Sequence, residues 1–496
     1  MNNRVMLINF YSPKSLGFRF LEHALTSAGF EVTVLYFKGF HSSRPKMPTD
    51  TERALMLELI QKTDPLFIGM SVMSSLYLEA VEALSTLVKS AVSAPVVWGG
   101  VFATLFLERS LPFCDYVLRG EGEYAIVDLA QRLSSGADVS DTLNLAYLKD
   151  GAAVVNDVRP VEHELDKLGM SPVGLDNKYF IDNDAITRRD PMLDSRSYET
   201  SGSRGCPFVC AYCSTVAQKR IYKDKGFMRF RSVGALIEEL KDAKAKMKKL
   251  NYIHFWDEIF ANDETWVDEF VARYKKEINL PFEIWAHPMK TDESVIKKLV
   301  SAGLYQVVMG IQSGSPSVRK QIFHRVETQE QILAAAEIFR KCKVPSVYYD
   351  LIVRHPFEST EQLIESYELC GQLPGNFILQ LHGLNFLPGT DIVKIALDMG
   401  LYTEDEMDKM MYGTMERQYL SWWGDEEHPP LTNFWYHLMY MQQFKAYRKK
   451  AGKLAENPGS EANRAAALKT YNFCRKLNRL RHYKRKALLI MRGTLG

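Results

Sequence analysis

The first 130 residues alternate between short apolar runs and amphipathic stretches. Apolar, often β-branched runs that end in small or polar residues cover 5–10, 32–37, 66–72, 94–100 and 114–120. Helical spacing of apolar positions lies between them, as over 18–28 and 77–90. This alternation predicts a doubly wound parallel sheet, and such sheets bind ligands at the carboxyl ends of their strands.

A second alternating array follows from residue 201. Its apolar runs cover 252–256, 282–287, 305–314, 346–353 and 378–387, with amphipathic helical stretches between them. The array is long enough for a partial or full (β/α) barrel, with its active site at the strands' carboxyl ends. After about residue 400 the strand pattern stops and the chain reads as helical.

The predicted fold class is therefore α/β, in four parts. They are an N-terminal Rossmann-like sheet domain over 1–135, a linker over 136–195 with a β-hairpin turning at Asp150-Gly151, a barrel over 196–400, and a helical C-terminal region with a basic tail over 401–496.

Composition narrows the class of protein. The chain has 496 residues, 46% apolar and 25% charged, which is typical of globular domains. The N-terminus combines a short apolar run with no small-residue cleavage site, which predicts a first strand, no signal peptide and a cytoplasmic protein. Seven cysteines, three of them within eight residues, favour metal ligation over a disulfide framework.

Three cysteines stand in the spacing CxxxCxxC, as Cys206, Cys210 and Cys213. Three thiolates on one short loop can hold three irons of a [4Fe–4S] cluster and leave the fourth iron open, whereas a structural zinc site needs four ligands. Cys114, Cys342, Cys370 and Cys474 are scattered and are interpreted as buried thiols.

This loop resembles the motif of radical S-adenosylmethionine (SAM) enzymes, and the resemblance continues downstream. It implies that the three cysteines bind the cluster, that the open iron chelates SAM, and that Tyr212 lies against the adenine. Asp257 and Glu258 in FWDEIF, and Gln312 and Ser313 in MGIQSGS, resemble segments that contact SAM. YYDLIVRHPFEST and LNFLPGT resemble later strand segments of the family, with Arg354 and Phe357 in place of two glycines. Alternatively, Asp257 and Glu258 could cap a helix, and Gln312 and Ser313 could be turn residues.

The N-terminal domain carries small residues after several strands. Together they resemble the cobalamin-binding domain of cobalamin-dependent radical SAM enzymes, where a serine and a glycine pair line the slot for the dimethylbenzimidazole tail. GGVFAT and VLRGEGEYA resemble family segments, with Phe102 in place of the usual histidine. The resemblance implies cofactor binding by Ser12, Gly17, Ser71, Met73, Ser74, Gly99, Gly100, Phe102, Thr104, Arg119, Gly120, Glu121 and Glu123.

The loop after the first strand lacks a histidine. Methionine-synthase-type domains place a cobalt-ligating histidine there, whereas this loop reads NFYSPKSLGF and His23 falls on the following predicted helix. We therefore expect cobalamin bound base-off and without a histidine ligand.

The resemblance favours a cobalamin-dependent radical SAM methyltransferase. It implies that one SAM methylates the cobalamin, and that a second yields the 5′-deoxyadenosyl radical that activates an unactivated carbon of a small-molecule or lipid-like substrate. An oxidase, cyclase or rearrangement enzyme without net methyl transfer is the alternative, and a cobalamin-binding sensor is a third. An external electron donor of the flavodoxin or ferredoxin type is implied. No catalytic residue is assigned; candidate substrate residues are Trp285, His287, Tyr348, Asp350 and His382, each of which could instead be barrel packing.

The C-terminal tail is strongly basic. Residues 441–496 hold 15 Lys+Arg against 2 Asp+Glu, while the other 440 residues hold 47 against 58. Leu477, Leu480, Tyr483, Leu488 and Ile490 would form an apolar stripe flanked by cations. The tail could dock on the protein's own acidic body, lie on an anionic membrane surface or bind nucleic acid, the last being least favoured.

Overall fold

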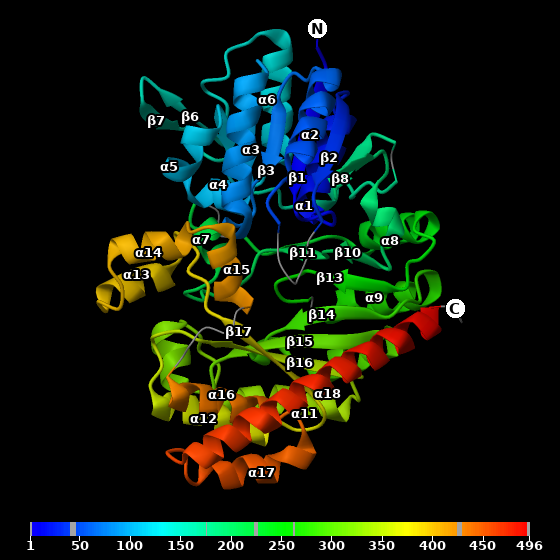
Figure 1. Cartoon of the computed structure of the whole chain (residues 1–496). Coiled ribbons are helices and arrows are strands. Elements are labelled where there is room, and N and C mark those ends of the chain that lie inside the picture. Colours follow the sequence, from blue (N-terminus) through cyan, green and yellow to red (C-terminus); the bar gives the residue numbers. More distant parts are fainter. Residues whose placement is uncertain are drawn as a thin grey trace.

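The computed structural model describes residues 2–39, 46–174, 176–222, 227–260, 263–423 and 429–493. It has an N-terminal domain above a second, larger domain (Figure 1). The central strands of the N-terminal domain are parallel and lie in the order β5-β4-β3-β1-β2. Their bounds are β1 Arg4–Phe10, β2 Glu31–Phe37, β3 Ile68–Ser71, β4 Val96–Gly99 and β5 Tyr116–Leu118.

Helices cover both faces of this sheet because its strands are apolar on both sides. The helices are α1 Leu16–Ser27, α2 Asp50–Thr63, α3 Leu78–Ala91, α4 Val101–Leu105, α5 Leu107–Ser110 and α6 Glu123–Ser135. Even-numbered residues of β1, such as Met6, pack with α2 and α3, whereas Val5 and Leu7 pack with α1 and α6. The predicted doubly wound parallel sheet is confirmed. The order reverses between β1 and β3, which is where such sheets bind ligands.

The predicted linker proves to contribute strands to this sheet. β6 (Leu145–Lys149) and β7 (Ala152–Val155) extend the β5 edge, and β8 (Lys178–Asp182) and β9 (Ala185–Thr187) extend the β2 edge. The hairpin at Asp150-Gly151 is confirmed, and both turn residues have positive φ, as a type I′ turn requires. The linker interpretation of 136–195 therefore missed β8 and β9 and did not place the hairpin in the sheet, because these short, half-exposed sequences lack a strong apolar pattern.

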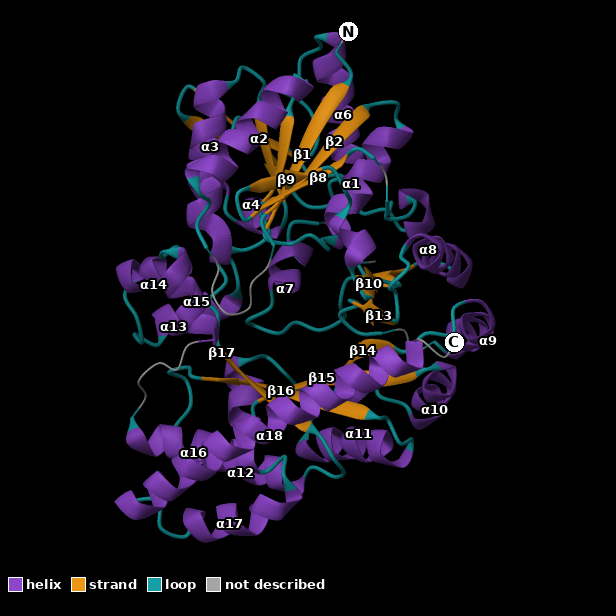
Figure 2. Cartoon of the chain, turned by 45° about the vertical axis from the view of Figure 1, so that its right-hand side comes forward, coloured by secondary structure: helices purple, strands orange, loops and turns teal. Residues whose placement is uncertain are grey.

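The second domain is built on an open, six-stranded parallel sheet in chain order, so the barrel is partial. Its strands are β10 Ser197–Thr200, β13 Tyr252–Phe255, β14 Phe282–Ala286, β15 Leu304–Gln312, β16 Ser346–Val353 and β17 Ile378–Gly383. Helices α8 Val233–Lys246, α9 Glu264–Glu277, α10 Glu293–Ala302, α11 Gln329–Lys341 and α12 Thr360–Gln372 pack on its outer face. Between β10 and α8 lie the short ribbon β11 (Ser203–Arg204) and β12 (Arg229–Phe230) and helix α7 (Ser214–Lys219). Figure 2 shows the two sheets one above the other.

The C-terminal region is helical, as predicted. It comprises α13 Asp391–Asp398, α14 Glu404–Met411, α15 Met415–Trp423, α16 Pro430–Met441, α17 Lys445–Ala455 and α18 Glu461–Gly493. Helix α15 contacts the N-terminal domain and β17, and the Met415 amide donates a 2.8 Å hydrogen bond to Glu79 of α3. Helix α18 packs on α16 and runs diagonally along the lower sheet (Figure 1).

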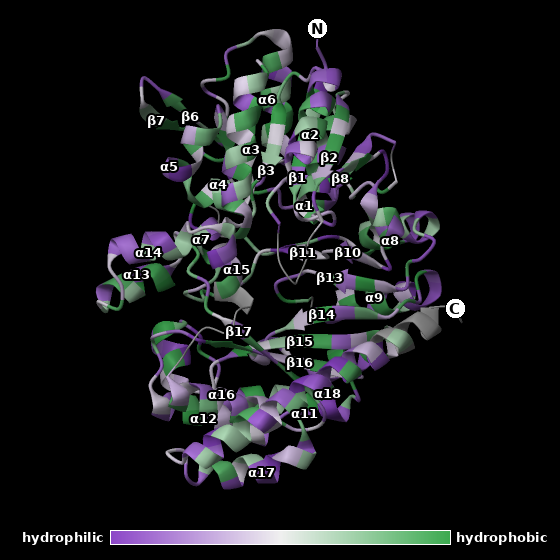
Figure 3. Ribbon diagram, in the orientation of Figure 1, coloured by the Kyte–Doolittle hydropathy of each residue, from purple (hydrophilic) through white to green (hydrophobic). Residues whose placement is uncertain are grey.

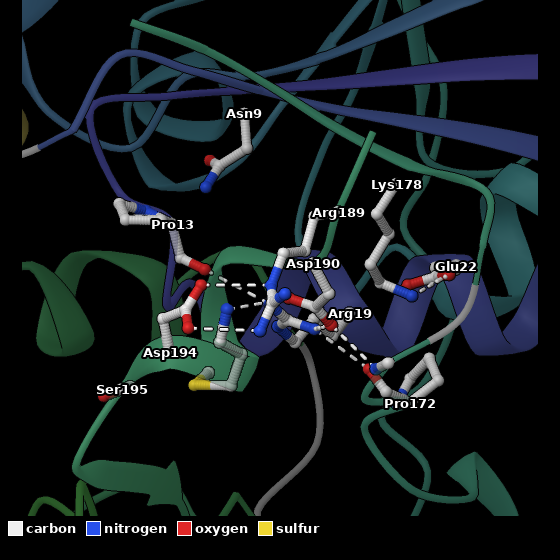
Figure 4. Close-up of polar contacts among 12 residues, drawn as sticks. Asn9, Pro13, Arg19, Glu22, Pro172, Lys178, Arg189, Asp190, Asp194 and Ser195 are labelled. Atoms are coloured by element: carbon white, nitrogen blue, oxygen red, sulfur yellow. Dashed lines mark hydrogen bonds and ion pairs between the residues drawn. The ribbon is translucent and has the colours of Figure 1, made fainter. Parts of the chain in front are cut away.

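A buried ion pair fastens α1 to the chain that leads into the second domain. The Arg19 guanidinium donates two 2.8 Å hydrogen bonds to Asp190 and a third to the Pro172 carbonyl (Figure 4). The Asp190 carboxylate also accepts from the Gly174 and Met192 amides. Since both charged groups are buried, this network fixes the crossing between the two domains.

Candidate functional site

A cavity of about 470 Å³ lies between the two domains, at the carboxyl ends of β3, β4 and β5. From the N-terminal domain it is lined by residues that include Gly17, Ser71, Met73, Gly99, Gly100, Thr104, Gly120, Glu121 and Glu123. From the second domain its lining includes Ser203, Arg204, Gly205, Thr215, Tyr222, Arg229, Arg231, Trp256 and Glu258. One space is thus shared by the predicted cobalamin loops and the predicted cluster loop.

Glycines shape the upper wall of this cavity. Gly100 has φ +101, and a Cβ there would lie 2.7 Å from the Val72 carbonyl oxygen, so only glycine fits without strain. Gly17 is the opposite case: a Cβ built on it meets no atom within 4 Å. A slot bounded by glycines and apolar side chains at a switch point fits a flat heterocycle such as the tail of cobalamin.

Some predicted cofactor residues do not line the cavity. The Ser12 carbonyl accepts a hydrogen bond from the Ser15 amide, and the Ser74 hydroxyl accepts one from the Leu76 amide. The Arg119 backbone amide donates a hydrogen bond to the Asn144 carbonyl, and the Arg119 carbonyl accepts one from the Asn144 side-chain amide. Phe102 is buried against Phe106 and Tyr412, so this side chain belongs to the core.

His23 also lies away from the cavity. It sits on α1 near Gly169 and Ser27, and burial lowers the pKa of its imidazole. No histidine is among the described residues that line the cavity.

The two glutamates of the RGEGE segment join the domains. Glu121 forms a two-point ion pair with Arg229, at 2.6 and 3.0 Å, and Glu123 accepts a 2.6 Å hydrogen bond from Arg204. Although burial opposes it, the Arg229 guanidinium holds the pKa of Glu121 below its ordinary value. Arg204 directly precedes the Gly205-Cys206 corner of the cysteine loop, so these pairs set the position of that loop relative to the cavity.

The three cysteines stand on one loop, between β11 and α7. The Cys213 amide donates to the Cys210 carbonyl, and burial and the two neighbouring cysteines raise the pKa of Cys206 to about 11. Within the described residues no three His, Cys, Asp or Glu side chains converge as they would on a single ion. A [4Fe–4S] cluster places each thiolate on a different iron, so three separate thiolates on one loop are the donor set that it takes.

A cation and several aromatic rings surround this loop, and the cation, Arg325, was not predicted from the sequence. The Arg325 guanidinium lies 4.0 Å from the Cys210 sulfur, donates to the Tyr212 hydroxyl at 3.2 Å, and contacts His287 at 3.1 Å. Phe208 of the loop stacks on His287, with ring centroids 3.7 Å apart. Burial, with Arg325 nearby, lowers the pKa of His287 to about 3, so this predicted substrate residue is neutral and part of the loop's support.

Asp257 and Glu258 lie next to the chain that leads into the cysteine loop. Asp257 accepts hydrogen bonds from the Ser203 hydroxyl at 2.5 Å and the Gly202 amide at 3.1 Å, and burial raises its pKa to about 6. Glu258 lines the cavity. The helix-cap alternative is wrong, because Asp263 caps α9.

Gln312 and Ser313 end β15 at an irregular point in the sheet. Gln312 has φ +69 next to a register shift against β16. Ser313 is buried and donates to Glu358 at 3.0 Å, and burial raises the pKa of Glu358 to about 7. Arg354, one of the two residues in place of glycine, takes φ +60, a backbone conformation that costs a non-glycine residue about 1 kcal/mol.

The remaining predicted substrate residues lie on the inner face of the lower sheet, opposite the helix-covered face. Trp285 and Asp350 each keep one buried polar atom, Nε1 and Oδ1, without a hydrogen-bond partner among the described residues. Burial alone raises the pKa of Asp350 to about 7. Tyr348 accepts from Arg485 of α18, and His382 is half-buried beside Arg354. The orphaned polar atoms of Trp285 and Asp350 fit a ligand that offers both hydrogen-bond donors and acceptors, as SAM does.

Comparison with known proteins agrees with this arrangement. A model of the B12 binding domain matches residues 10–130, and a model of the radical SAM superfamily matches residues 200–370. The chain belongs to the cobalamin-dependent radical SAM family. The two matched stretches are the two domains whose facing loops line the cavity.

Relatives and solved structures of this radical SAM enzyme carry several activities. An uncharacterised methyltransferase of Pyrococcus horikoshii is 26% identical over 68% of this chain and 71% of its own length. Cytidylyl-2-hydroxyethylphosphonate methyltransferase of Streptomyces wedmorensis is 22% identical over 80% of both chains. An anaerobic magnesium-protoporphyrin IX monomethyl ester cyclase of Cereibacter sphaeroides is 22% identical over 64% of this chain and 50% of its own length. The cobalamin-dependent enzyme OxsB, solved with aqua-cobalamin, shares the fold with a TM-score of 0.68 at 15% identity, covering 99% of this chain and 84% of its own.

Proposed function

We propose that this enzyme is a methyltransferase that uses SAM twice, as methyl donor to cobalamin and as source of a carbon-centred radical, to methylate an unactivated carbon of a small-molecule or lipid-like substrate. The observation that carries the proposal is the shared cavity, which faces Ser71, Gly99 and Gly100 on one side and Arg204 and Glu258 on the other. When bound, the cluster and SAM would supply the 5′-deoxyadenosyl radical and cobalamin the methyl group.

Three sets of the chain's own residues would hold these groups. Cys206, Cys210 and Cys213 would bind the cluster, and Arg325, which is itself ion-paired with the buried Glu327, would lie beside the Cys210 sulfur. The Asp350 and Trp285 polar atoms would bind donors and acceptors of SAM or the substrate on the inner sheet face. We propose that cobalamin binds base-off and without a histidine ligand, since no described residue lining the cavity is a histidine.

Methyl transfer is tested by its products. Anaerobically reconstituted enzyme, given SAM, hydroxocobalamin, a one-electron reductant and an extract of small metabolites, should form both S-adenosylhomocysteine and 5′-deoxyadenosine. A metabolite should gain one methylene unit in mass, and it should carry deuterium when the methyl group of SAM is deuterated. Formation of 5′-deoxyadenosine with a substrate mass change that lacks this label would contradict methyl transfer.

Oxidative ring formation is the second candidate, and the magnesium-protoporphyrin cyclases among the relatives favour it. A cyclase would form 5′-deoxyadenosine without stoichiometric S-adenosylhomocysteine. The same assay therefore separates the two functions by the ratio of these two products.

The cobalt ligand is tested by electron paramagnetic resonance of the cob(II)alamin form. Base-off cobalamin without a nitrogen ligand should show no nitrogen superhyperfine splitting. A triplet pattern that His23→Ala removes would show that the protein does supply a ligand.

An external one-electron donor of the flavodoxin or ferredoxin type is also part of the proposal. Reduced flavodoxin should support 5′-deoxyadenosine formation at a rate that saturates with its concentration.

Among the described residues, no helix is long and apolar enough to cross a membrane.

A further inference from the structure

Helix α18 has two different faces. One face docks on the protein: Cys474 is fully buried, the Asn478 amide donates to the Tyr440 hydroxyl at 3.0 Å, and the Arg481 guanidinium lies 4.1 Å from the Phe444 ring centroid. Arg485 continues this face and contacts Ser346 and Tyr348 on β16. The predicted docking of the tail on the body of the protein is therefore found over the described residues.

The opposite face is exposed and apolar. Phe473, Leu480 and Tyr483 are spaced at i, i+7 and i+10, so they follow one side of the helix. Their exposed fractions are 49%, 64% and 67%. Among the exposed large apolar side chains of the described residues, Leu480 and Tyr483 have the highest exposed fractions. Such residues cost free energy in water unless something covers them.

Cations share this exposed face. Lys469, Lys476 and Lys484 lie on the same side by helical spacing, all three are exposed, and Arg479 is exposed next to them. No Asp or Glu follows Glu461 in the helix. In Figure 3 the coloured part of helix α18 carries both hydrophilic and hydrophobic residues.

We propose that the exposed face of α18 binds an anionic lipid surface. Leu480, Tyr483 and Phe473 would enter the headgroup region, while the lysine ammonium groups reach the lipid phosphates and carboxylates. The combination favours lipid over nucleic acid, because a phosphate backbone alone would need the cations and leave the exposed leucine and tyrosine uncovered. The docked face anchors the helix to β16 and would hold the partial barrel next to the lipid surface.

The proposal is tested by sedimentation of the full-length protein with vesicles. The protein should sediment with vesicles of phosphatidylcholine and phosphatidylserine at low salt, remain in solution with phosphatidylcholine alone, and lose binding as salt screens the charges. The double variant Leu480→Glu/Tyr483→Glu should bind the anionic vesicles at least about tenfold more weakly than the wild type. Lys476→Glu/Lys484→Glu should weaken vesicle binding equally, because it reverses two charges that attract the anionic lipids. Replacing both lysines with arginine keeps the charges and should retain binding.

The matched control places two glutamates elsewhere. Leu148 and Ile186, on the edge hairpins of the upper sheet, are also exposed, so Leu148→Glu/Ile186→Glu changes net charge equally and should bind as the wild type does. Unchanged urea midpoints would show that the surface variants fold. The proposal is overturned if the wild type does not sediment with anionic vesicles, if binding ignores phosphatidylserine, if the α18 variants bind normally, or if the protein binds an RNA or DNA duplex but no vesicle.

Discussion

Glu121 and Arg229 form a two-point ion pair across the boundary between the two domains, at 2.6 and 3.0 Å. The Arg229 side chain is almost fully buried, and its third contact is the Glu162 carbonyl at 2.8 Å. The pair stands beside the cavity, so the segment that resembles a cofactor motif also fastens one cofactor domain to the other.

Glu121→Gln should destabilise the protein by about 2–4 kcal/mol, because it leaves the Arg229 charge buried without its counter-charge. Since the folded-state pKa of Glu121 is lowered, the wild-type advantage should be present above the unfolded pKa of about 4.3 and vanish as pH falls through the folded value. Urea unfolding of both proteins from neutral to acid pH measures this. Glu164→Gln, in an exposed pair with Lys167, is the control and should change stability by under about 1 kcal/mol.

Gly17→Leu should strongly weaken cobalamin binding while the protein stays folded. A side chain at Gly17 would project into open space at the cavity, and leucine has a higher helix propensity than glycine, by about 0.5–1 kcal/mol. We therefore expect an unchanged or raised melting temperature with at least about tenfold weaker cobalamin binding, read by absorbance titration. Gly452→Leu, at an equally open helical position of α17, should bind cobalamin normally. Normal binding by the Gly17 variant would place the cofactor elsewhere.

Replacing Cys206, Cys210 and Cys213 together with alanine should abolish the cluster's absorbance and the bound iron. These thiols share one loop, whereas Cys114, Cys370 and Cys474 are buried singly in cores. Iron analysis after anaerobic reconstitution measures the effect, and Cys342→Ala should keep full iron content. A near-stoichiometric cluster in the triple variant would refute the ligand assignment.

Asp350→Asn should make the protein more stable at pH 8 than the wild type, by about 1–3 kcal/mol, and no more stable at pH 4. Burial raises the pKa of Asp350 to about 7, so the folded wild type favours the protonated form and loses stability as pH rises from about 4 through that value. Urea unfolding at both pH values checks the sign. Asparagine keeps an acceptor oxygen at this position, so added SAM should stabilise both proteins if the Oδ1 atom accepts a hydrogen bond from it. An equal pH dependence of the two proteins would show that Asp350 is ionised and satisfied in the folded state.

The elements and the local chemistry follow from the sequence alone. Apolar runs of strand length and helices with one apolar stripe follow from local periodicity, so the central strands of both sheets were predictable, and the spacing of Cys206, Cys210 and Cys213 places three thiols on one loop whatever surrounds it. Relationships between distant residues depended on tertiary packing. Arg325 comes to Cys210 across 115 positions, Glu121 meets Arg229 across 108, and 136–195 adds edge strands, because burial and pairing partners are set by the folded whole. For the same reason composition showed that the tail is basic and amphipathic, but only the packing of α18 on α16 and β16 decided which face is buried and which meets solvent.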